Sequence, residues 1–303
     1  MGNIQNFFAR KKGETLNILG FGLWSLFPIF AKLSFQNLPV LFTASGMAFF
    51  AALFFIVVVS VQRKWHELRN TAALQDIFRG TLLIGVLYYS LVFWGLKHTS
   101  AGNAAIIGLL EILFTFLLFG IWRKEQHRAV HMLGAGLMVL GAAVVLFPGK
   151  IDLHQGDLII LLASLVPPLG NFYQQQARKK VSAGVVMLGR SALSFILLFG
   201  LSFWLETPPS FGNFQAGLPY LIVAGIGLFG ISKILYIESL SAISVPRAIA
   251  LTAIAPAFTL LFAYLFLTEI PNLGQILGLL PIAIGAFFIT KSPISFSAKD
   301  AAY

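Results

Sequence analysis

The chain is organised around an apolar stretch that opens with Leu96-Lys97-His98-Thr99-Ser100-Ala101 and closes with Trp122-Arg123-Lys124-Glu125. A related stretch begins 144 positions further on, opening with Leu240-Ser241-Ala242-Ile243-Ser244-Val245 and closing with Leu267-Thr268-Glu269. Without a gap, this shift places Leu96 on Leu240, Ser100 on Ser244, Ala104 on Ala248, Phe114 on Phe258, Thr115 on Thr259 and Glu125 on Glu269. An internal repeat indicates that one structural module occurs more than once. We therefore predict two repeats, residues 1–149 and 150–303.

The composition indicates that most of this chain is solvated by lipid. Hydrophobic residues make up 58% of the sequence and charged residues 11%, and the mean hydropathy is +0.86. A soluble domain carries about a quarter charged residues, so this chain has too little polar surface for water. It contains no cysteine, which excludes disulfides and thiolate metal sites.

Ten apolar segments have roughly the 20 residues that a helix needs to cross a bilayer. The first follows a cationic cluster and is long enough to span, so we expect a retained helix rather than a cleaved signal peptide. The segments are 15–35, 40–62, 78–97, 101–122, 129–148, 156–177, 184–205, 217–238, 244–267 and 272–290.

The positions of the Lys and Arg residues predict the orientation. Most of the 21 cations gather at alternate ends of the spans, and such residues accumulate on the cytoplasmic side. We therefore expect both termini in the cytoplasm and the protein in the cell (inner) membrane. The net charge of +10 then reflects topology and not nucleic-acid binding. The cations on this side are Arg10, Lys11, Lys12, Arg63, Lys64, Arg69, Arg79, Arg123, Lys124, Arg128, Arg178, Lys179, Lys180, Lys291 and Lys299.

Five spans per repeat is an odd number, so the second repeat is expected to enter the membrane upside down. Inverted repeats recur in secondary transporters, whose halves exchange conformations around a site near the membrane midplane. The expected fold is an all-α integral membrane protein with ten transmembrane helices in two inverted five-helix repeats.

This pattern resembles the drug/metabolite transporter superfamily, specifically its EamA branch. The resemblance is carried by Gly95–Ala101 through Glu125, by Glu238–Val245 through Pro256 to Glu269, and by the small-residue spans Gly134–Gly141 and Gly278–Gly285. It covers nearly the whole chain, and its motifs are specific for the fold and poor for the substrate.

The resemblance implies a central cavity lined mainly by helices 1, 3, 4, 6, 8 and 9, with helices 5 and 10 to the side. It also implies transport of small organic molecules such as amino acids or related metabolites. One departure is that branch members often carry an Arg early in the second helix. Here Arg190 fills that role in the second repeat, and its counterpart in the first is Gly46.

Glu111 is the clearest candidate for the substrate site, because a charge in the bilayer interior costs at least about 2.5–3.5 kcal/mol. It lies in the middle of the fourth span, and Asn103 lies eight positions earlier on the same helix face. We predict that both bind substrate and that Glu111 also couples transport to protons. A structural ion pair or hydrogen bond to a neighbouring helix is the alternative.

Lys233 is a second charge within a span, with Tyr236 one turn away on the same face. It could hold a substrate carboxylate, pair with Glu111, or extend its stem to the interface. Trp24, Tyr88 and Tyr89 complete the predicted substrate-binding set, although aromatic residues also collect at membrane interfaces. Asn171 belongs to the sixth span but lies near its end.

Four prolines interrupt spans and are candidate hinges. Pro28 lies in the first span, Pro167 and Pro168 in the sixth, and Pro256 in the ninth. Each removes a helical hydrogen bond and favours a kink. We predict that the helices bend at these positions during alternating access, and a static kink is the alternative.

Together these features predict a secondary active transporter that exports small amphipathic metabolites by alternating access. A passive channel, a uniporter or a lipid-scrambling protein remains the alternative. An enzyme is not expected, because the five His do not cluster with carboxylates and no GxSxG or phosphate-binding loop occurs. We expect no cofactor and no metal. The expected partners are a small-molecule substrate and membrane lipid, not nucleic acid, and the Gly-rich spans fit either a monomer or a homodimer.

Overall fold

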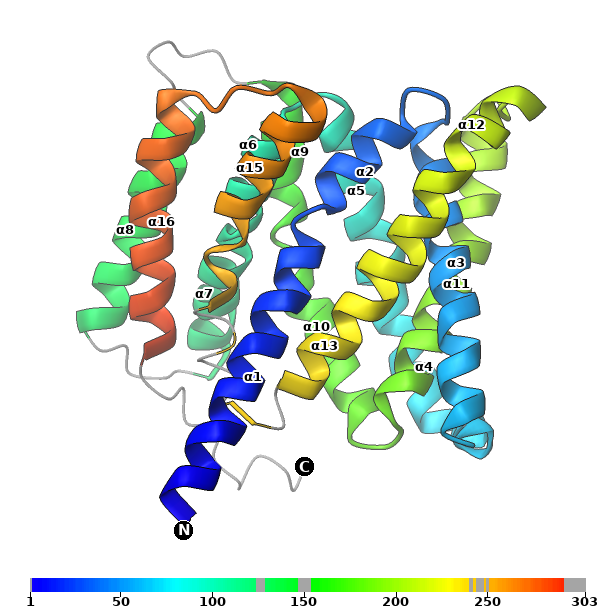
Figure 1. The fold of residues 1–303 in the computed structure, drawn as a ribbon, viewed down its shortest axis with the longest axis horizontal. Coiled ribbons are helices and arrows are strands. Elements are labelled where there is room, and N and C mark those ends of the chain that lie inside the picture. The colour runs from blue at the N-terminus through cyan, green and yellow to red at the C-terminus, as the bar shows by residue number, and fades with distance from the viewer. Residues whose placement is uncertain are drawn as a thin grey trace.

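The computed structural model describes residues 2–123, 129–146, 154–239, 242–243, 248 and 251–291, and all regular structure in these ranges is helical (Figure 1). Backbone groups in hydrocarbon must be satisfied within their own segment, which apolar stretches of this length achieve as helices. The elements are α1 (Gly2–Trp24), α2 (Phe27–Ser34), α3 (Val40–Val61), η1 (Trp65–Arg69), α4 (Thr71–Gly80), η2 (Thr81–Tyr88), α5 (Tyr89–Lys97), α6 (Ala101–Gly108), α7 (Leu110–Arg123), α8 (Ala129–Leu146), α9 (Gln155–Ala163), α10 (Pro167–Arg178), α11 (Ala183–Leu205), α12 (Phe211–Ile222), η3 (Val223–Ile231), α13 (Ser232–Ser239), α15 (Ala255–Leu267) and α16 (Leu273–Lys291).

Nine helical stretches within the described ranges are long and apolar enough to cross a membrane. They correspond to nine of the predicted spans, so the expected all-helical architecture is confirmed. The described part of the remaining span, 244–267, is the shorter apolar helix α15. Because residues 244–247 and 249–250 lie outside the described ranges, the count of ten spans stays a prediction.

The helices run between two faces of the molecule. The face that we call N-terminal carries the start of α1, η1 and the turn at 179–182, and it lies at the bottom of Figure 1. The opposite face, called distal, carries the turns at 35–39, 98–100, 206–210 and 268–272.

Helices of the first half pack against helices of the second. The most extensive contacts join α3 to α11 and α8 to α16, and further contacts join α1 to α13, α5 to α9 and α6 to α15. In Figure 1, α8 and α16 lie side by side at one edge of the molecule.

Glycines let α8 and α16 approach each other closely. A Cβ atom added at Gly134 would lie 2.7 Å from the carbonyl oxygen of Gly285, and one at Gly141 would lie 2.5 Å from that of Gly278. Both distances are far below van der Waals contact, so only glycine fits, as is common where membrane helices cross closely. These four glycines therefore serve the packing of α8 against α16 within one chain.

All four predicted hinge prolines lie at breaks between short helices. Pro28 lies in the first turn of α2, Pro167 and Pro168 begin α10, and Pro256 lies in the first turn of α15. A proline is tolerated there because the first-turn N–H groups have no helical partner. The breaks are structural facts, and their movement stays a prediction.

Two spans contain π-helical segments, η2 and η3, at nearly equivalent places of the two halves. Both segments lie in the middle of a longer continuous helix, after α4 and α12 respectively. Such wide turns are rare and occur frequently at functional sites.

Candidate substrate-binding site

A cavity of about 530 Å³ lies between helices of both halves. It extends toward the N-terminal face, where Thr290 near the end of α16 lines it. A smaller cavity of about 160 Å³ continues toward the proline breaks and is lined by Pro28 and Pro256. Trp24 and Glu111 line both, so the two cavities meet at these side chains. We call them together the central cavity.

Glu111 projects into the central cavity from the first turn of α7. One of its carboxylate oxygens accepts a hydrogen bond of 3.0 Å from the side-chain amide of Asn171 on α10. This bond joins the two halves of the chain. The sequence placed Asn171 near the end of a span, where its function could not be inferred; only the packing of α10 against α7 brings the two residues together.

Lys233 enters the same cavity from α13, and its ammonium group lies 3.4 Å from the ring centroid of Trp24. This is a cation–π contact, which holds a cation without neutralising it. Among the described residues, no ion pair within 4.0 Å involves Lys233 and Glu111. The two opposite charges therefore face one cavity separately, and the alternative of a direct Glu111–Lys233 pair is not observed.

The predicted aromatic residues divide between two environments. Trp24 and Tyr236 line the larger part of the central cavity, and Tyr88 lines the smaller part. Tyr89 does not line it, and its role in substrate binding stays a prediction. Its ring packs instead against the rings of Phe27, Phe93 and Phe229, because consecutive helical residues point in different directions.

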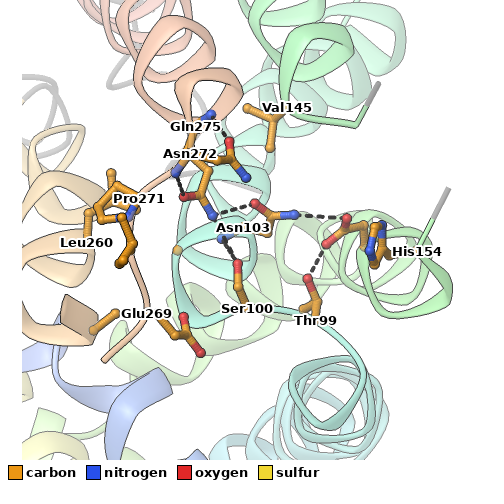
Figure 2. A pocket seen from close by; sticks show the side chains of 14 residues that line it. Thr99, Ser100, Asn103, Val145, His154, Leu260, Glu269, Pro271, Asn272 and Gln275 are labelled. Atoms are coloured by element: carbon orange, nitrogen blue, oxygen red, sulfur yellow. Dashed lines mark hydrogen bonds between the residues drawn. The ribbon is translucent and has the colours of Figure 1, made fainter. Parts of the chain in front are cut away.

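Asn103 also lies outside the central cavity, and its role in substrate binding stays a prediction. It lines a separate pocket at the distal face, shown in Figure 2, where its side chain bonds Asp157 and Gln275. Eight residues of helix span about 12 Å along the axis, so a shared face does not mean a shared depth. The helix is also interrupted between α6 and α7, at Leu109.

Among the described residues outside the spans, Glu67 has a clearly shifted pKa. Burial alone would raise the pKa of Glu67, which lies in η1, but hydrogen bonds from Ser182 and the adjacent Lys64 ammonium lower it to about 2. Within the described ranges no group of three or more His, Asp or Glu side chains could hold a metal ion.

The helices of the two halves enclose a cavity with separated charges, an arrangement that fits a membrane transporter. Residues 11–147 and 154–291 each match the EamA-like transporter family. Because these matches include most of the chain, the protein belongs to the EamA-like transporter family and is an integral, multi-pass membrane protein. A family of transporters speaks against the enzyme alternative.

Individual relatives are similar over large parts of the chain. An uncharacterized transporter of Synechocystis is 22% identical over 235 residues, which cover 73% of this chain and 67% of the relative. The pseudopaline exporter CntI of Pseudomonas aeruginosa is 30% identical over 147 residues, 48% of this chain and 49% of CntI. One crystal structure superposes with a TM-score of 0.63 at 18% identity and covers 93% of this chain and 97% of its own, a likeness of fold alone.

Proposed function

We propose that this protein is a secondary transporter that exports a small zwitterionic, amphipathic metabolite, such as an amino acid or a related compound. The observation that carries the proposal is that Glu111 and Lys233 face one cavity without pairing to each other. Unpaired charges are costly in a membrane interior. A zwitterion would neutralise both, because its ammonium group would bind Glu111 and its carboxylate would bind Lys233.

The lining of the cavity fits such a ligand. Glu111 and the Asn171 amide would receive an ammonium group, and Lys233 would receive a carboxylate. Leu109 and Ile112 offer apolar surface in the same cavity. A volume of about 530 Å³ falls in the usual range for small-molecule sites, roughly 300–1,000 Å³.

The alternating access that we propose uses two halves of equivalent structure in opposite orientations, residues 1–149 and 150–303, with ten spans in total. The glycine contacts support this arrangement. Under the shift of 144 positions, Gly134 corresponds to Gly278 and Gly141 corresponds to Gly285. Exchanging each glycine for its counterpart therefore turns the contact of Gly134 with Gly285 into the contact of Gly278 with Gly141. A twofold axis between α8 and α16 would produce this exchange.

A second pair of contacts has the same reciprocal form. Glu67, which follows the second span, accepts a hydrogen bond of 2.6 Å from the backbone N–H of Ser182 at the start of α11. Glu206, which follows α11, accepts bonds of 2.9 and 3.0 Å from the N–H groups of Leu41 and Phe42 at the start of α3. Carboxylates stabilise helix starts by binding free N–H groups, and here each half supplies one to the other at opposite faces.

The proposed direction of transport rests on the side to which the cavity extends, and the proposed coupling to protons rests on Glu111. The larger part of the central cavity faces the cation-rich N-terminal side, which the positive-inside rule assigns to the cytoplasm of a cell with the protein in its inner membrane. Substrate would load there and leave on the distal side. A proton arriving from the distal side would occupy Glu111 and displace the ammonium group. The naming of one relative as an exporter supports this direction.

The proposal can be tested with purified protein in two steps. A thermal-shift screen against amino acids and related metabolites identifies a ligand, whose saturable counterflow is then measured in proteoliposomes. An imposed pH gradient should drive transport by the wild type and not by Glu111→Gln. As a control, Glu206→Gln removes a carboxylate outside the cavity and should keep the response. Flux that does not saturate would favour a channel or scramblase, and equal responses of both variants would refute coupling through Glu111.

A further inference from the structure

The distal face is closed by polar side chains that take no part in the central cavity. We call Lys32, Thr99, Asn103, Asp157, Glu269 and Gln275 the distal cluster. Five of them line a pocket of about 280 Å³, seen in Figure 2, which shares no lining residue with the central cavity. Thr99 and Glu269 belong to the distal turns at 98–100 and 268–272, so the cluster lies on the distal side of that cavity.

An ion pair forms the first layer of the cluster. The Lys32 ammonium on α2 lies 2.8 Å from one carboxylate oxygen of Glu269, which follows α15. Lys32 also donates a bond of 2.7 Å to the backbone carbonyl of Thr99. The other oxygen of Glu269 accepts a bond of 2.9 Å from the N–H of Ala101 at the start of α6. Both charged groups are thus joined to the same turn, which lies between the ends of α5 and α6.

A second layer joins two more helices to this turn. Asp157 on α9, which is only 2% exposed, accepts hydrogen bonds from the Thr99 hydroxyl and from the Asn103 amide. The Gln275 amide on α16 donates to Ser100 and to Asn103, at 3.0 and 2.7 Å. The start of α6 is therefore bonded from α2, α9, α16 and the segment after α15.

Each charged member of this cluster lies on a short helix next to a proline break, or directly after such a helix. Lys32 belongs to α2, whose first turn contains Pro28. Asp157 lies in the first turn of α9, which ends before Pro167, and Glu269 follows α15, which has Pro256 in its first turn. Bending at these breaks, which stays a prediction, would move the distal segments that carry the three charged groups.

We propose that the distal cluster is the external gate of the transporter, and that this structure is its inward-facing state with the gate closed. This inference rests on the alternating access proposed above, and it names the residues that close the distal side. A polar gate suits repeated opening because water replaces the lost contacts. The Lys32 and Glu269 side chains are each 24% exposed, and ion pairs with access to water contribute little net stability. An apolar seal would offer no such replacement.

The gate can be tested without a substrate, because the chain contains no cysteine. Ala105→Cys places a reporter thiol on the lining of the smaller part of the central cavity, behind the distal cluster. Intact spheroplasts are treated with a membrane-impermeant maleimide, and the labelling rate is measured. The reporter alone should label slowly. Adding Lys32→Gln or Glu269→Gln should raise the rate roughly two- to five-fold, the change in an open–closed equilibrium expected when one partly exposed ion pair is lost.

Two further variants make the result decisive. Glu206→Gln removes a distal carboxylate that also binds helix N–H groups but lies outside the cluster, and it should leave the rate unchanged. The charge exchange Lys32→Glu with Glu269→Lys should return labelling toward that of the reporter alone. Fast labelling of the reporter alone, or unchanged labelling in both single variants, would overturn the gate. This experiment measures no transport, so a result that overturns the gate does not refute the proposed export, which the pH-gradient assay tests separately.

Discussion

The contact between α8 and α16 gives a prediction whose size follows from the structure. In Gly141→Ala the new Cβ would lie 2.5 Å from the carbonyl oxygen of Gly278, against 3.4 Å for ordinary contact. A backbone oxygen cannot turn aside, so the two helices must separate by about 0.9 Å, the difference between these distances. Overpacking of this kind costs about 1–3 kcal/mol, and the better helix propensity of alanine returns up to about 1 kcal/mol. We expect a net loss of stability of about 0–3 kcal/mol.

The same helix provides the control. Gly136 is exposed, and a Cβ added there meets no atom within 4 Å. Gly136→Ala should therefore gain up to about 1 kcal/mol from helix propensity alone, which places the two variants about 1–3 kcal/mol apart. Thermal unfolding of the purified proteins, followed by tryptophan fluorescence, measures this difference. If Gly141→Ala unfolds at the same temperature as Gly136→Ala, the close glycine contact is not what joins these helices.

Two other substitutions test the charged groups. Lys233→Met keeps the length of the side chain but removes the group proposed to bind the substrate carboxylate. We expect substrate affinity measured by thermal shift to fall roughly ten-fold or more. Lys97→Met is the control, because it removes a lysine outside the cavity, 6.0 Å from the ring of Trp94, and should leave substrate affinity unchanged. The pKa of Glu67 is lowered from 4.5 to about 2 in the folded protein, so its stabilising contribution is present above pH 4.5 and is lost as the pH falls toward 2. Glu67→Gln should flatten the decline in melting temperature between these values, and an unchanged decline would show that the bond to Ser182 does not couple stability to pH.

Much of the architecture could be predicted from the order of the residues. A segment in lipid must bond its own backbone groups, so apolar stretches of about 20 residues predict helices before any packing is known. The shift that relates Leu96 to Leu240 predicted two similar units, and the family matches fall on two successive stretches. Glu111 and Lys233 could be selected because charged residues are rare where lipid is the solvent, and both line the cavity.

The structure departs from the expected lining of the cavity where local periodicity was used to infer a location in space. Asn103 and Glu111 share a helix face, but the distance along the axis places them in different pockets. Tyr88 and Tyr89 are neighbours in sequence, yet only Tyr88 lines the cavity. Periodicity specifies direction around one axis and contains no information on depth or on the neighbouring helix.

The repeated stretch from Leu96 to Glu125 illustrates what the sequence determines and what the tertiary structure decides. By itself the sequence determined that the stretch occurs twice, that it is helical, and that its second copy ends in Glu269. Only the tertiary structure decided that Glu269 bonds Lys32 and the start of α6, and that Asn171 bonds Glu111. Such contacts join residues far apart in the chain, and they depend on how the helices of the two halves pack, which no single segment encodes.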